Sequence, residues 1–168
     1  MPTVTATALP PAPANVQSAQ GVLGQMPYYN LIIQLTQNSL ADAQSDNVLS
    51  DSQLSTNVQT AVATYKHLPP QSQQSIIQQY SALWLFLPTY ITNARIVDDY
   101  NQQNLVPLYG AMPNNTEMGQ AAQRYLQQFF SGVGVTPPDA QQTTSTESHV
   151  PVLVIAGAGL LLIFLVTR

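Results

Sequence analysis

Two histidines, His67 and His149, are the residues of this chain best suited to proton transfer near neutral pH. A Ser-His-Asp arrangement would have to use one of them, and a Cys-His pair is excluded because the sequence contains no cysteine. His67 stands before a double proline at a predicted helix end, where a cation stabilises the helix. His149 borders an apolar run and is expected at a membrane boundary. We therefore predict no catalytic residue.

The acidic residues offer two further places where chemistry could occur. Asp98 and Asp99 are neighbours, but neighbouring side chains of a helix point about 100° apart and do not converge on one atom. Asp42, Asp46 and Asp51 lack the glycine and the ligand spacing of a calcium loop. We expect these carboxylates to be solvated, and we predict no metal site.

The glycine and asparagine motifs are equally weak signals of chemistry. Gly132-Val133-Gly134 does not have the length of a phosphate-binding loop, and no dinucleotide fingerprint occurs. Asn114-Asn115-Thr116 fits a glycosylation sequon, which matters only if the domain is exported in a host that glycosylates. The sequence therefore predicts no cofactor and no small-molecule substrate.

Composition limits the possible partners. Only 7% of the 168 residues are charged, against about 25% in ordinary globular proteins. With four Lys or Arg and eight Asp or Glu, the net charge is -4, so no basic surface exists to neutralise phosphates. We expect no nucleic acid as a principal partner. A length of this order suits one domain with a modest core.

The last residues of the sequence carry its strongest pattern. Val150–Val166 contains 17 apolar or small residues without a charge, and a helix of that length spans roughly 25 Å. A buried core helix would present polar positions to water, and this run has none. We therefore predict a transmembrane helix over residues 150–167. Its anchoring side chains are expected to be Val150, Leu153, Ile155, Leu160, Leu162, Phe164 and Val166.

The flanking segments have the compositions of tethers. Residues 1–25 combine several prolines with Ala, Thr and Val, which favours an extended arm, and they lack the features of a secretory signal peptide. Residues 132–149 are rich in Ser, Thr, Gln and Pro and are expected to form a stalk. With an anchor late in the chain, the domain should stay on the side of the membrane where it is synthesised.

Residues 26–131 are expected to form an all-α domain, a small bundle of four to five short helices. Apolar side chains recur there at spacings of three and four residues. One helix should begin near Asp51 as N-cap and end at Leu68, and Pro88 should kink the next helix or start a new one. A loop is expected at residues 104–113, and a last helix should begin at Asn114 and end at Gly132. The core should include Leu83, Trp84 and Leu87.

Together these features predict a protein that acts by position and contact and is not an enzyme. The expected partners are a lipid bilayer and other structural proteins or neighbouring copies of the chain. One hypothesis is a structural protein that links a bilayer to a protein shell, such as a minor capsid protein of a virus with an internal membrane. The alternative is a cellular tail-anchored adaptor or surface protein that recruits a partner through its helical domain.

Overall fold

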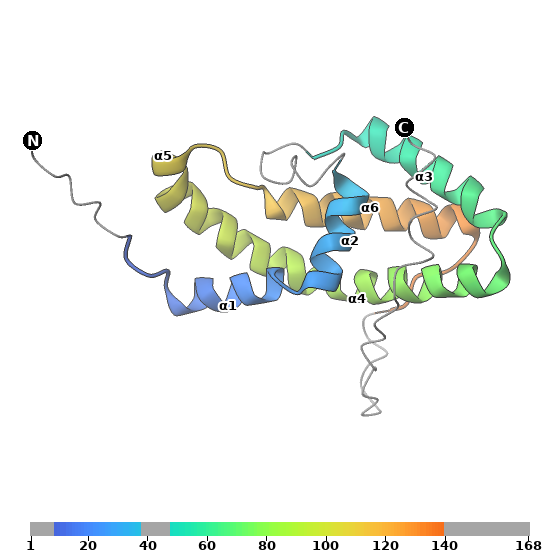
Figure 1. Cartoon of the computed structure of the whole chain (residues 1–168), viewed down its shortest axis with the longest axis horizontal. Helices are drawn as coiled ribbons and strands as arrows, with labels where there is room; N and C mark the ends of the chain where they lie inside the picture. The colour runs from blue at the N-terminus through green and yellow to red at the C-terminus, as the bar shows by residue number, and fades with distance from the viewer. Residues whose placement is uncertain (1–8, 38–47, 140–168) are drawn as a thin grey trace, which may run out of the picture.

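The computed structural model describes residues 9–37 and 48–139 (Figure 1). In these ranges every regular element is helical, which confirms the all-α fold for this part of the chain. The elements are α1 (Ala14–Leu23), α2 (Met26–Thr36), α3 (Asp51–Lys66), α4 (Pro70–Tyr100), the π-helix η2 (Asn101–Leu105), α5 (Val106–Tyr109) and α6 (Asn115–Val133). The expected transmembrane helix lies outside the described residues.

Helix α6 is the centre of the fold. It packs against α2, α3 and α4, and Figure 1 shows it running between α3 and α4. Its buried positions repeat at three- and four-residue spacings, so one continuous apolar stripe faces its neighbours. These positions are Met118, Gly119, Ala121, Ala122, Tyr125, Leu126, Phe129 and Phe130.

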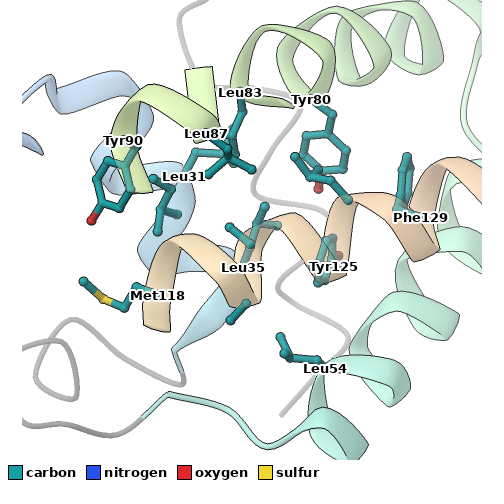
Figure 2. Close-up of a cluster of buried hydrophobic side chains, with 14 of the residues drawn as sticks. Leu31, Leu35, Leu54, Tyr80, Leu83, Leu87, Tyr90, Met118, Tyr125 and Phe129 are labelled. Carbon is teal, nitrogen blue, oxygen red and sulfur yellow. The ribbon is translucent and has the colours of Figure 1, made fainter. Parts of the chain in front are cut away.

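The core is formed mainly where α4 lies along α6, and it is rich in aromatic side chains (Figure 2). The ring of Tyr80 meets that of Phe129 edge to face, with centroids 4.9 Å apart. Tyr65 of α3 approaches the same Phe129 ring from another side at 5.6 Å. Because each buried ring removes a large apolar area from water, this cluster supplies much of the domain's stability. Leu83 and Leu87 are fully buried as expected, whereas Trp84 is only partly buried.

Pro88 does not end a helix, because it lies inside α4, which is 31 residues long. Proline lacks an N–H, so the carbonyl of Trp84 loses its helical partner, a change that costs about 3 kcal/mol in a helix interior. Leu87 and Tyr90, on either side of Pro88, are nevertheless fully buried against the rest of the core. Packing outweighs the lost hydrogen bond, and the ribbon of α4 bends midway along its length (Figure 1).

The N-terminal region differs from the extended arm expected over residues 1–25. Residues 14–23 form helix α1, which packs on α4 and buries Val16, Ala19 and Leu23. The prolines at positions 10, 11 and 13 precede this helix, and Pro13 occupies its N-cap position. The spacing of the three buried residues is helical, so a reading of composition alone missed a short amphipathic segment.

The boundaries of α3 are close to those expected, with a different N-cap. Ser50 is the N-cap, and its hydroxyl accepts from the backbone N–H of Gln53 at 3.3 Å. The Gln53 side chain accepts in return from the backbone N–H of Ser50, which completes a capping box. Asp51 therefore belongs to the first helical turn and is not the cap. Pro70 is the first residue of α4, a position that suits the fixed φ of proline.

The segment expected to be a loop at residues 104–113 is partly helical. The π-helix η2 follows α4 directly, and the four-residue α5 follows η2. Gly110 ends α5 with φ of 82°, a conformation that other residues rarely adopt. The chain then returns to α6 through residues 111–114.

Candidate functional site

Asp98 is hydrogen-bonded to Asn115 and Thr116, so the expectation that it is a solvated carboxylate is wrong. Its Oδ1 accepts from the backbone N–H and the side-chain amide of Asn115, at 3.2 and 2.8 Å. Its Oδ2 accepts from the backbone N–H and the hydroxyl of Thr116, at 2.7 and 2.6 Å. Asp99 is exposed, in agreement with the different directions of adjacent side chains on a helix.

The four hydrogen bonds to Asp98 complete the N-terminus of α6. The first four N–H groups of a helix have no partner within it. Those of Asn115 and Thr116 donate to Asp98, and that of Glu117 donates to the Asn114 side chain at 3.0 Å. The first regular bond of the helix then runs from the Met118 N–H to the Asn114 carbonyl. The expected start of the last helix at Asn114 is confirmed, with Asn114 as its N-cap, and the negative carboxylate of Asp98 lies at the favourable end of the helix dipole.

The sequon residues Asn114 and Thr116 are thus used to start α6. Asn114 is exposed, its Oδ1 accepts within the cap, and the Thr116 hydroxyl donates to Asp98. The sequon has a defined structural task whether or not it is ever modified.

Asp51 takes part in a surface ion pair with Arg124. The Nε of Arg124 lies 3.1 Å from its Oδ1, without hydrogen-bond geometry, and the Arg124 Nη2 donates to Glu117 at 3.0 Å. The Asp51 side chain is 82% exposed, so this contact between α3 and α6 contributes little to stability. Among the described residues, no three His, Cys, Asp or Glu side chains gather into a possible metal site.

His67 is exposed at the C-terminal end of α3, in the capping position expected for it. It borders an open groove of about 490 Å³ between α3 and α6. The groove is lined by Ser55, Val58, Gln59, Val62, Ala63, Lys66, His67, Gln128 and Gly132. Ser55 and His67 stand twelve residues apart along α3, about 18 Å, so they cannot form a nucleophile-base pair. No carboxylate lines the groove to orient the histidine.

The glycines of Gly132-Val133-Gly134 serve helix packing and helix termination. A Cβ atom added at Gly132 would lie 2.7 Å from a Val62 methyl group, so this glycine permits the close approach of α3 and α6. Gly134 has φ of 73° and caps α6 in the left-handed conformation. The helix therefore extends slightly past the expected end at Gly132.

The strongest perturbations of protonation in the described residues fall on core tyrosines. Burial raises the pKa of Tyr125 to about 12, and burial together with the neighbouring Tyr125 raises the pKa of Tyr80. Burial also raises the pKa of Tyr90, whose hydroxyl has no hydrogen-bond partner among the described residues. These shifts keep the phenols neutral inside the packed core.

Exposed apolar side chains form the feature that the sequence motifs did not signal. Leu108 and Tyr109 of α5 are 60% and 68% exposed, and they are adjacent. The sequence does hold a signal for them, because residues 105–113 contain no charged side chain and only one polar group, the Tyr109 hydroxyl. This pattern is not the one expected of a loop, which is usually polar.

Several expected site residues lie outside the described residues. They are Asp42, Asp46, His149 and the anchor residues Val150, Leu153, Ile155, Leu160, Leu162, Phe164 and Val166. Within residues 9–37 and 48–139, each helix is too short or too polar to traverse a bilayer.

Comparison with known proteins assigns no family to the chain. No family model, no curated protein and no solved structure matches it.

Proposed function

We propose that this chain is a non-enzymatic, single-pass membrane protein that links a lipid bilayer to a protein shell. A minor capsid protein of a virus with an internal membrane is the form of this function that suits the chain best. The helical domain supplies contacts to other structural proteins, and residues 150–167 supply the anchor.

The observation that carries the proposal is the apolar run Val150–Val166. Its 17 residues contain no charge. A charged or polar side chain is costly to place in lipid, so a run without any is suited to a bilayer. The run follows the helical domain after a short connection, since ten residues separate Asp139 from Val150. The domain is thereby held close to the bilayer, on the side where it is synthesised.

The structure of the domain supports a contact role. The polar groups that might have served chemistry have other tasks: Asp98 and Asn114 start α6, Asp51 pairs with Arg124, and His67 ends α3. The stretch from Pro70 to Ala94 on α4 carries no charged residue, so its exposed side chains are mostly Gln, Thr and Pro. Such a surface makes many neutral contacts whose strength changes little with pH or salt.

The alternative is a cellular tail-anchored adaptor that recruits a partner. The open groove between α3 and α6 is the observation that favours it, because a groove on a helical domain can receive a partner segment, and here Lys66 is the one lysine or arginine among the described residues of the lining. The two functions differ in what accompanies the chain: coat proteins in assembled particles, or a soluble partner at a cellular membrane.

Complementation of a strain or virus that lacks the chain tests the proposal. The double variant His67→Ala with His149→Ala should support normal particle yield, because the proposed function needs no proton transfer by either histidine. Deletion of Val150–Arg168 should abolish incorporation into particles. As a matched control, an unrelated apolar span of equal length in place of residues 150–166 should restore it.

Two results would contradict the proposal. One is loss of function in the double histidine variant with fold and membrane insertion preserved, which would reopen an enzymatic role. The other is full particle yield without the anchor. Co-purification of a soluble cellular partner, with no coat protein, would favour the adaptor.

A further inference from the structure

We infer that the exposed turn α5 inserts into the surface of the same bilayer that holds the anchor, so that the domain contacts lipid at a second point. This inference rests on the proposed function, because it requires the anchor to be in a bilayer. The contact residues are Leu108 and Tyr109, supported by Val106 and Pro107.

The chemistry of the turn favours lipid. Leu108 and Tyr109 leave 60% and 68% of their surface exposed, although single exposed apolar residues are the usual case on a soluble domain. From Tyr100 to Thr116 no residue is charged, so burying the turn desolvates no ion. Leucine suits the acyl region, and tyrosine suits the boundary where its ring is covered and its hydroxyl stays wet.

The shape of the turn points the same way. The short helix α5 lies at one end of the long axis of the molecule and is closed by Gly110 (Figure 1). A projecting turn of four residues cannot cross a bilayer, but it can enter the zone between headgroups and acyl chains. Apart from the Tyr109 hydroxyl, the turn offers no polar side chain with which to select a protein partner.

The tether makes the contact reachable. Ten residues separate Asp139 from Val150, and a chain of that length spans at most about 36 Å. The domain therefore cannot leave the neighbourhood of the membrane, and the local concentration of lipid around α5 is high. Under these conditions a small contact has more effect, because the anchor already holds the turn near the lipid.

A fluorescence experiment on the full chain in phosphatidylcholine vesicles tests this inference. The chain has no cysteine, so one introduced cysteine carries an environment-sensitive dye at a single site. The probe at Ala111→Cys, exposed beside α5, should be quenched by lipids bearing a nitroxide on the acyl chain and should emit at shorter wavelength. The control probe at Gln78→Cys, exposed on α4, should remain in water.

A second variant assigns the effect to the two side chains. In the Ala111→Cys background, Leu108→Ser with Tyr109→Ser should lower the ratio of inserted to free turn at least roughly tenfold, because about 1.4 kcal/mol of lost burial gives that factor. Both side chains are exposed, so the fold should be kept, and circular dichroism checks this.

Each outcome decides the matter. The inference is overturned if the chain floats with the vesicles but the probe at position 111 is as exposed to water as the probe at position 78. That result would leave the anchor intact. A shielded probe without lipid quenching, growing with protein density in the vesicles, would mean that another copy covers α5. A chain that does not float would overturn the proposed function and the inference with it.

Discussion

Replacing Asp98 by alanine should destabilise the domain far more than replacing its neighbour Asp99. The carboxylate of Asp98 accepts four hydrogen bonds from Asn115 and Thr116, and two of the donors are backbone N–H groups of the first turn of α6. Helix α6 is the element against which α2, α3 and α4 all pack. Loosening its first turn therefore acts on the centre of the fold.

The magnitude follows from three contributions. Loss of a helix cap costs about 0.5–2 kcal/mol, and hydrogen bonds to a charged group are worth about 1.5–3 kcal/mol. The carboxylate also loses about 0.3–1 kcal/mol of attraction to the helix dipole. These contributions overlap, and water replaces part of them because Asp98 is only half buried. We expect about 2–3 kcal/mol for Asp98→Ala.

Urea unfolding of the chain truncated after Asp139, followed by circular dichroism, measures this effect. Asp99→Ala removes the same charge from an exposed side chain and should change the free energy of unfolding by less than about 0.5 kcal/mol. Asp98→Asn keeps one acceptor oxygen and should fall between the two. Equal effects of Asp98→Ala and Asp99→Ala would refute the capping role.

Three further predictions concern the core. Gly119→Ala should cost about 1–2 kcal/mol in the same assay, since its Cβ would lie 2.8 Å from Ile91 and 2.9 Å from Tyr90; a neutral result would mean that these side chains move freely. Trp84→Ala should cost about 2–3 kcal/mol, below the loss for a fully buried ring, because Trp84 is only partly buried against the core. No loss would mark Trp84 as a contact residue. The free energy of unfolding should fall as pH rises from about 10 to about 12, because Tyr125 loses its proton at lower pH in the unfolded state than in the folded state. Tyr125→Phe should remove this residue's share of the pH dependence, and a variant with the same pH profile as the original chain would contradict the burial of Tyr125.

The helical nature of the domain could be predicted from the sequence because apolar spacing is a local pattern. The positions of α3 and α6 follow from that spacing and from local N-caps. The cap of α3 is Ser50, one residue before the expected Asp51, and the cap of α6 is Asn114. The path of α4 through Pro88 does not, because it depends on the packing of Leu87 and Tyr90 in the common core. Local proline rules were overridden there by tertiary contacts.

The role of Asp98 also escaped prediction for a physical reason. Its partners lie 17 and 18 residues further along the chain, and only the turn at α5 brings them within hydrogen-bond distance. Helical spacing places Asp98 beside the exposed Asp99, so sequence reasoning assigned both to solvent. The groove between α3 and α6 and the exposed turn α5 likewise arise from how helices meet.

Membrane extraction of the full chain is the most direct measurement of the central claim, that residues 150–166 anchor this protein in a bilayer. The chain and a version ending at His149 are expressed in the same cells, and their membranes are washed with alkaline carbonate and floated on a density gradient. Leu160→Arg, a charge at the centre of the span, serves as a milder variant that should weaken insertion by about 2.5–3.5 kcal/mol. The full chain should resist the wash and float while the shortened chain is released, and a shortened chain that still floats after the wash would contradict the account.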